Sequence, residues 1–148
     1  MRPTDERPYP RTGRLHLDQT IHLVVGATEA LPVTVRFTYD AADPLAVRMD
    51  FTGCADVLAP WVFARDLLYA GLRGSSGVGH VRVWPDRRRR GAGSVRILLS
   101  DTEGTAMLRV PGAPFEKWLT KTYSVVPAGT EGDHLYWDDV VRQLLRQD

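Results

Sequence analysis

An alternation of apolar and polar residues near the start of the chain constrains the fold more than any other feature. Apolar side chains occupy the odd positions of residues 15–25, where only Gln19 interrupts them, and the same alternation returns at residues 33–39 and 45–51. Because side chains alternate between the two faces of a strand, the pattern predicts three half-buried strands that share one apolar face. Residues 40–44 predict the turn between the second and third strands. An antiparallel meander is therefore expected.

The middle of the chain predicts more strands and a short helix. Residues 57–63 suit a fourth strand, and residues 65–70 suit a helix that Gly71 ends. The many glycines and serines of residues 71–79 predict a mobile loop. Further strands are expected at residues 81–83, 95–99 and 105–110, with a hairpin tip at 87–91 and a turn at 101–104.

The apolar period changes in the last third of the chain. Phe115, Trp118, Leu119 and Thr122 follow helical spacing, and residues 137–145 repeat it. Strands that precede helices predict an α+β fold, with an antiparallel β-sheet meander followed by C-terminal helices. The 148 residues suit one domain, which we place at residues 15–148 after a flexible N-terminal arm at residues 1–14.

Charge and cysteine content narrow the expected compartment and partners. The formal net charge is +1, and residues 1–14 hold four arginines against two acids, so the rest of the chain is close to neutral. A neutral body lacks the basic field that collects nucleic acid. The single Cys54 excludes an internal disulfide, and no apolar run approaches the roughly 20 residues of a membrane span. We expect a soluble cytoplasmic protein.

The sequence lacks the usual motifs of catalysis, metal binding and phosphate binding. His16 and His22 would lie about 20 Å apart along one strand, too far to share a metal ion. The glycines at residues 77–79 and 91–93 lack the third glycine of a dinucleotide fingerprint. The two serines of the 71–79 loop do not form a nucleophile elbow. We therefore expect no enzymatic activity, no cofactor and no metal site.

Four consecutive arginines form the most basic segment of the chain: Arg87, Arg88, Arg89 and Arg90. At a hairpin tip they would suit contacts with phosphates, with Trp84 nearby as a stacking platform. Because the body is near neutral and the run is isolated, we favour a solvated loop over an acidic protein partner, and both over nucleic acid.

Three ordered motifs carry a resemblance to a known family. They are TYDAADPLAV at residues 38–47, WVFARDLL at residues 61–68 and GHVRVWP at residues 79–85. With these motifs, the chain resembles the SsgA-like proteins of sporulating actinobacteria, most closely those of the SsgB type, over about residues 15–145. The arm and the arginine run depart from the pattern of that family.

The resemblance implies a non-enzymatic, sporulation-specific cell-division factor. Such a protein marks future septum sites and recruits the tubulin-like protein FtsZ, together with an SsgA-type paralogue, and reaches the membrane only indirectly. The resemblance also implies a fold similar to the whirly and mitochondrial guide-RNA-binding proteins, a homotrimer and no cofactor. The rival hypothesis is a single-stranded nucleic-acid-binding protein on the same fold, with the arginine run as its basic tip.

The motifs also supply the candidate residues. The residues expected to be structural are Trp61, Phe63, Leu67, Gly79, Val81, Val83 and Pro85. The possible partner-binding residues are Arg65, Asp66, Trp84, Arg87, Arg88, Arg89 and Arg90. For the tryptophans, packing is favoured over a role as an interface hot spot. For Arg65 and Asp66 both alternatives stay open, because adjacent opposite charges also pair with neighbours.

Overall fold

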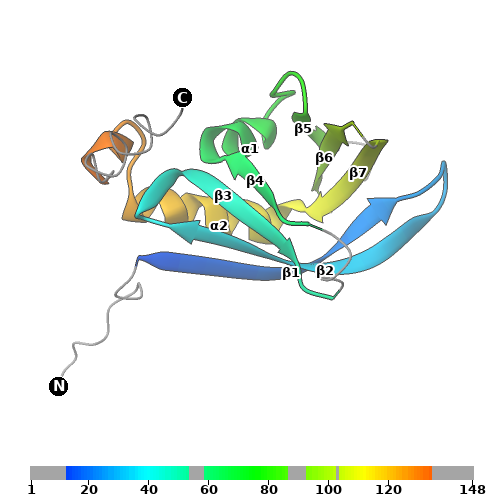
Figure 1. The fold of residues 1–148 in the computed structure, drawn as a ribbon, viewed down its shortest axis with the longest axis horizontal. Coiled ribbons are helices and arrows are strands. Elements are labelled where there is room, and N and C mark those ends of the chain that lie inside the picture. Colours follow the sequence, from blue (N-terminus) through cyan, green and yellow to red (C-terminus); the bar gives the residue numbers. More distant parts are fainter. Residues whose placement is uncertain (1–12, 54–58, 87–92, 103, 135–148) are drawn as a thin grey trace.

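The computed structural model describes residues 13–53, 59–86, 93–102 and 104–134. Within them, one seven-stranded antiparallel sheet has the order β4-β3-β2-β1-β7-β6-β5 (Figure 1). Its strands are β1 (Arg14–Val24), β2 (Ala30–Asp40), β3 (Asp43–Phe51), β4 (Trp61–Ala64), β5 (Val81–Asp86), β6 (Ser94–Asp101) and β7 (Gly104–Pro111). The helices are α1 (Arg65–Gly71), α2 (Gly112–Val125) and the short 3₁₀ helix η2 (Glu131–His134). The predicted α+β class is confirmed.

The first three strands follow the predicted alternation. β1 and β2 pair without interruption from Arg14↔Asp40 to Val24↔Ala30. Ile21 is fully buried in the core, as the odd-position pattern of β1 predicts. β1 begins at Arg14, so the last residue of the predicted arm belongs to the sheet, and residues 1–12 lie outside the described residues.

The turn after β2 is tighter than predicted. Only Ala41 and Ala42 lie between the strands, and Pro44 is already part of β3. The Asp40 carboxylate accepts a hydrogen bond from the Ala42 N–H at 2.9 Å, and the Tyr39 hydroxyl donates to the Pro44 carbonyl at 3.0 Å. A turn-forming aspartate thus closes the hairpin with two residues, and the prediction of a turn over residues 40–44 is wrong in length.

The sheet as a whole is not a single meander. β4 and β5 follow one another along the chain but form opposite edges, and β1 joins the halves by pairing with β7 only at residues 22–24. α1 connects the two edges and contacts strands of both halves, because the sheet curls around it (Figure 1). Pairing between distant segments decides this order, and local periodicity does not report it.

The glycine-rich loop that follows α1, which the sequence predicts to be mobile, pairs with β5 at one residue. Ser76 and Val83 exchange both backbone hydrogen bonds, each 2.8 Å long. Gly77 has a φ of 94°, and a Cβ atom there would lie 2.4 Å from the Val81 carbonyl oxygen, so only glycine fits this close approach. The loop therefore covers part of the exposed edge of β5.

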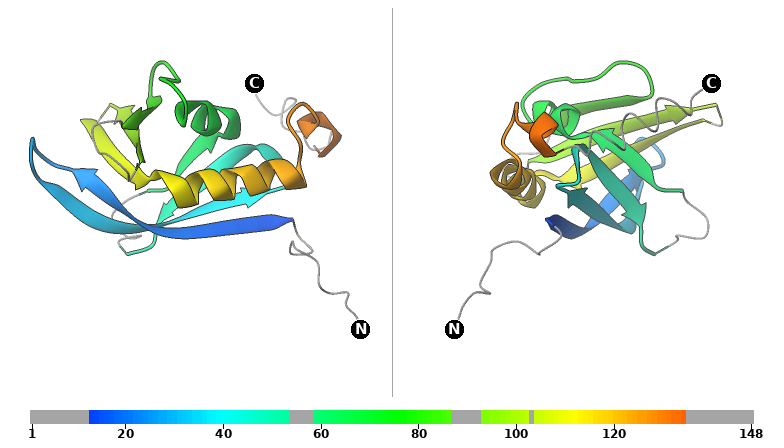
Figure 2. Two further views of the ribbon diagram at one scale, coloured as in Figure 1. Left: turned by 180° about the vertical axis from the view of Figure 1, so that it is seen from behind. Right: turned by 60° about the vertical axis from the view of Figure 1, so that its left-hand side comes forward.

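α2 lies between the long β1–β2 ribbon and α1 (Figure 2). Its buried residues are Phe115, Trp118, Leu119 and Thr122, which confirms the predicted helical face. The ring centroids of Phe37 and Phe115 lie 4.9 Å apart, so the helix packs on the inner face of the sheet. The predicted helix at residues 137–145, the hairpin tip at 87–91 and part of the predicted strand at 57–63 lie outside the described residues.

Candidate functional site

The residues of the two tryptophan-containing motifs lie on the connection from β4 through α1 to β5. Phe63 and Val83 belong to the buried core. Trp61, Leu67 and Val81 are partly buried and pack against that core. Gly79 has a φ of 88° just before β5, and Pro85 lies within β5, which is an edge strand and tolerates a missing N–H. Trp84 points to the opposite, outer face of the sheet and is partly exposed.

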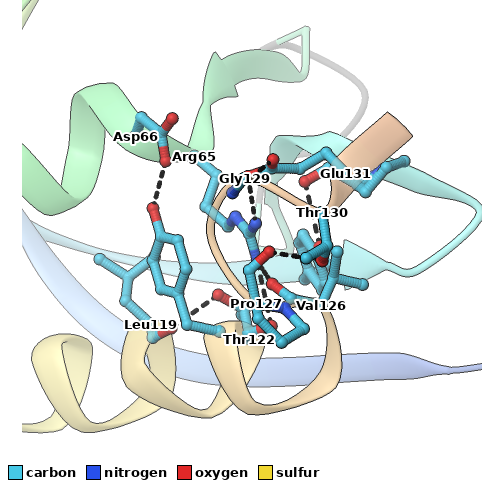
Figure 3. Close-up of polar contacts among 12 residues, drawn as sticks. Arg65, Asp66, Leu119, Thr122, Val126, Pro127, Gly129, Thr130 and Glu131 are labelled. Atoms are coloured by element: carbon cyan, nitrogen blue, oxygen red, sulfur yellow. Dashed lines mark hydrogen bonds and ion pairs between the residues drawn. The ribbon is translucent and has the colours of Figure 1, made fainter. Parts of the chain in front are cut away.

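Arg65, the first residue of α1, faces the core and is fully buried. Its guanidinium donates to the carbonyl oxygens of Thr122 at 3.0 Å and Val126 at 2.9 Å (Figure 3). It also pairs with the Glu131 carboxylate at 2.7 Å and lies 3.9 Å from the centroid of the Tyr123 ring. The Thr122 carbonyl also accepts the Val126 N–H at 3.0 Å, so Arg65 adds a cation at the end of α2, where the helix dipole is negative.

Glu131 balances the buried guanidinium from the other side. One carboxylate oxygen accepts from Arg65 and the other accepts from the Gly129 N–H at 2.9 Å. Hydrogen bonds from its own backbone N–H and from Arg65 hold the pKa of Glu131 below its usual value. Residues 126–131 are thus tied to α1.

This pair predicts a specific pH dependence of stability. Because the pKa of Glu131 is lowered in the folded state, its stabilisation is present above the usual value of 4.5 and is lost as the pH falls through the folded pKa. We expect the difference in unfolding free energy between the wild type and Glu131→Gln to shrink steadily below that value. Urea titrations from pH 7 to pH 3 measure it, and a constant difference would contradict the assignment.

Asp66 is exposed, but it is also engaged within the chain. It accepts a hydrogen bond from the Tyr123 hydroxyl at 2.5 Å (Figure 3). Burial, and next this bond to Asp66, raise the pKa of Tyr123. The two adjacent charged residues of α1 therefore both bond to α2. Arg65 does so in the core and Asp66 at the surface. The alternative left open for Arg65 is answered in favour of the core.

The outer face of the first half of the sheet carries compensated charges. Ion pairs there join Arg36 to Asp18 at 2.7 Å, Arg14 to Asp40 at 3.0 Å and Arg48 to Asp50 at 3.0 Å. The hydrogen bond from Arg36 lowers the pKa of Asp18. These pairs are exposed, so each contributes little to stability, and they leave this face nearly neutral.

The outer face of the second half carries a row that the sequence did not reveal. Strand register places Trp84 opposite Arg96, Arg96 opposite Arg109, and Arg109 opposite His22, across β5, β6, β7 and β1. We call these four residues the basic row. Arg96, Arg109 and His22 come from three separate strands, so only the register could have found them.

An apolar groove of about 380 Å³ is lined by Leu23, Val33, Trp61 and Leu108 among others. Among the described residues, no three His, Cys, Asp or Glu side chains are grouped as metal ligands. Within the same part of the chain, no helix is long and apolar enough to cross a membrane. Arg87, Arg88, Arg89 and Arg90 lie outside the described residues.

Fold and surface together define an α+β protein built on one curled antiparallel sheet, with its charged groups arrayed on the outer face. The family described as "Streptomyces sporulation and cell division protein, SsgA" matches residues 33–131. The chain belongs to this SsgA family, and the resemblance predicted from its motifs is confirmed.

Relatives in this family match the chain over most of its length. It is 43% identical over 127 residues to the sporulation-specific cell division protein SsgB of Streptomyces coelicolor, covering 86% of this chain and 92% of that protein. It is 38% identical over 137 residues to SsgB of Salinispora tropica, covering 91% of this chain and 95% of that protein.

Solved structures agree with the sequence comparison. One, described as "Mutations in SsgB correlate to longitudinal cell division during sporulation of Streptomyces coelicolor", has a TM-score of 0.77 at 44% identity, over 82% of this chain and 94% of that one. The SsgA-like sporulation-specific cell division protein of Thermobifida fusca has a TM-score of 0.76 at 32% identity, over 88% and 94%. A likeness to whirly proteins stays a prediction.

Proposed function

We propose that this chain is a non-enzymatic cell-division factor that marks septum sites during sporulation and recruits FtsZ by direct contact. The observation that carries the proposal is its nearly end-to-end similarity to SsgB of Streptomyces coelicolor, which is named a sporulation-specific cell division protein. In this proposal the protein works in the cytoplasm at division septa, with an SsgA-type paralogue, and contacts the membrane only through partners.

The proposed mechanism is multivalent presentation of one surface. Identical copies in a homotrimer would offer several FtsZ contacts, and linked contacts raise the effective concentration of the partner without a new interface. The internal bonds of Arg65 and Asp66 support this mechanism, because they tie α1 to α2 and favour a rigid framework behind the surface. A mass measurement in solution tests the trimer, and a monomer would remove the avidity argument.

Co-sedimentation tests the proposed recruitment. Purified FtsZ is polymerised with GTP, mixed with the chain and centrifuged, and we expect the chain to appear in the pellet only when polymers are present. A fluorescent fusion in a sporulating actinobacterium should form regularly spaced bands before septa appear. If the chain stays in the supernatant with and without polymers, direct recruitment is contradicted.

A further inference from the structure

The basic row on the outer face of β5, β6, β7 and β1 has the properties of a docking surface. We propose that it binds an acidic polypeptide segment of a protein partner, with Arg109 as the central charged contact and Trp84 as the aromatic contact. The proposal deepens the proposed function and rests on it for the identity of the partner, because it names the surface that such a partner would contact.

Arg109 occupies an unfavourable position for the isolated protein. It is directly opposite Arg96 on one side and His22 on the other. Side chains that face each other across neighbouring strands have Cβ atoms about 4.5–5.5 Å apart, so the guanidinium groups of Arg109 and Arg96 repel each other, although the pairing of Arg96 with Asp86 reduces this repulsion. A bound carboxylate would reverse this repulsion, so the position favours an anionic ligand.

The two arginines of the row differ in their compensation. Arg96 pairs with Asp86 at 2.9 Å, and these side chains are only 16% and 3% exposed. Arg109 is partly exposed and, among the described residues, has neither an ion pair nor a side-chain hydrogen bond. One guanidinium therefore keeps its full donor capacity for a partner.

A hollow beside Arg109 provides room for such a ligand. It has a volume of about 390 Å³ and lies between the β1–β2 hairpin and the outer face, where its lining includes Thr28, Glu29, Asp86, Arg96 and Arg109. Glu29 forms no ion pair with Arg109 within the described part of the chain. Asp86 is already paired with Arg96, so Arg109 is the group of this hollow that would bind an acidic side chain, through two parallel hydrogen bonds.

The length of the row suits a short extended segment. Strands in a sheet are about 4.8 Å apart, so the row from Trp84 on β5 to His22 on β1 spans roughly 14 Å. An extended peptide covers that distance with four or five residues at about 3.3 Å each. Arginine and tryptophan are also the residues that most often dominate binding at protein interfaces.

The charge balance favours an acidic protein segment over nucleic acid. The whole chain has a formal net charge of only +1, and the first half of the sheet is compensated by its own ion pairs. Nucleic-acid binding depends on many phosphate contacts that release counterions, and the basic row offers one guanidinium without an ion pair among the described residues. A local contact with a few carboxylates needs no such field.

Fluorescence anisotropy of the full chain tests the proposal. The probes are a fluorescein-labelled peptide of ten glutamates and a labelled ten-nucleotide oligothymidine, both at 50 mM and 200 mM salt. We expect the wild type to bind the peptide, and Arg109→Glu to weaken this binding about ten-fold or more, because a charge-assisted hydrogen bond becomes a repulsion. Arg109→Gln, which removes the charge without reversing it, should give an intermediate loss.

Lys121→Glu is the matched control, since it makes the same change of charge on the exposed side of α2. We expect it to bind the peptide within about two-fold of the wild type, because α2 packs on the inner face of the sheet and the basic row lies on the outer face, and salt screens an exposed charge. Arg109→Glu should fold normally, because a carboxylate there faces Arg96 and His22. Circular dichroism and thermal unfolding check this.

Three outcomes would overturn the proposal: no peptide binding by the wild type, an equal loss in Lys121→Glu, or tighter binding of the oligothymidine that depends on Arg109. FtsZ pelleting separates this proposal from the proposed function. If Arg109→Glu pellets with FtsZ as the wild type does, the basic row is overturned as the contact while recruitment stands. If the wild type binds the peptide but does not pellet, recruitment fails while the surface stands.

Discussion

Replacement of Arg65 by alanine is expected to lower the free energy of unfolding by about 3–5 kcal/mol. The change leaves the Glu131 carboxylate without its buried cation and leaves the carbonyls of Thr122 and Val126 without this donor. It also removes a side chain that is fully buried, so a cavity adds to the cost. Urea denaturation followed by circular dichroism measures the effect.

The matched control for Arg65 is Arg36→Ala, which breaks the exposed ion pair with Asp18. We expect this change to cost less than about 1 kcal/mol, because water screens an exposed pair and the side chains are ordered at an entropic cost. A double variant, Arg65→Met with Glu131→Gln, should cost less than the sum of the single changes, because neither charge is left alone. Equal effects of Arg65→Ala and Arg36→Ala would contradict the assigned role.

Replacement of Gly71 by alanine is expected to destabilise the fold by about 1–3 kcal/mol. A Cβ atom at this last residue of α1 would lie 2.1 Å from Val83 Cγ1 and 2.6 Å from Val83 Cβ. Val83 is fully buried in β5 and its branched side chain is stiff, so it cannot turn away. This overlap outweighs the gain of about 1 kcal/mol that alanine normally brings to a helix.

Gly74→Ala is the control for Gly71, because a Cβ atom there would have nothing within 4 Å. We expect its stability to stay within about 0.5 kcal/mol of the wild type. Val83→Ala removes the Cγ1 atom at 2.1 Å but keeps the Cβ atom at 2.6 Å. The overlap is therefore only partly relieved, and the double variant Gly71→Ala with Val83→Ala should be more stable than additivity predicts without recovering the full loss. An additive result would show that the close approach of α1 and β5 is not the cause.

These two positions explain why the tryptophan-containing motifs stand out in the sequence. The segment from Trp61 to Pro85 crosses from one edge of the sheet to the other, and α1 is its central element. Arg65 bonds α1 to the end of α2, while Gly71 lets α1 lie directly on β5. Residues of these motifs therefore hold the two halves of the sheet together. The basic row lies on the opposite, outer face of the sheet.

The candidate site was only partly predictable. Arg65 and Asp66 were identified from the sequence as a pair of unusual charges, but their separate roles depend on Glu131 and Tyr123, which lie 66 and 57 residues farther along the chain. Trp84 was identified as an aromatic candidate, but its neighbours in the basic row were not. Arg96 and Arg109 look like ordinary polar positions of two strands until the register places them opposite each other.

Local periodicity by itself determined the strands β1 to β3, the buried face of α2 and the α+β class. Side-chain direction alternates along a strand and repeats every 3.6 residues along a helix, so the burial of these elements is readable in the sequence. The tertiary structure alone decided that β1 pairs with β7, that β4 and β5 form opposite edges, and that Arg65 is buried. Each of these depends on contacts between distant segments, whose free energy no local pattern records.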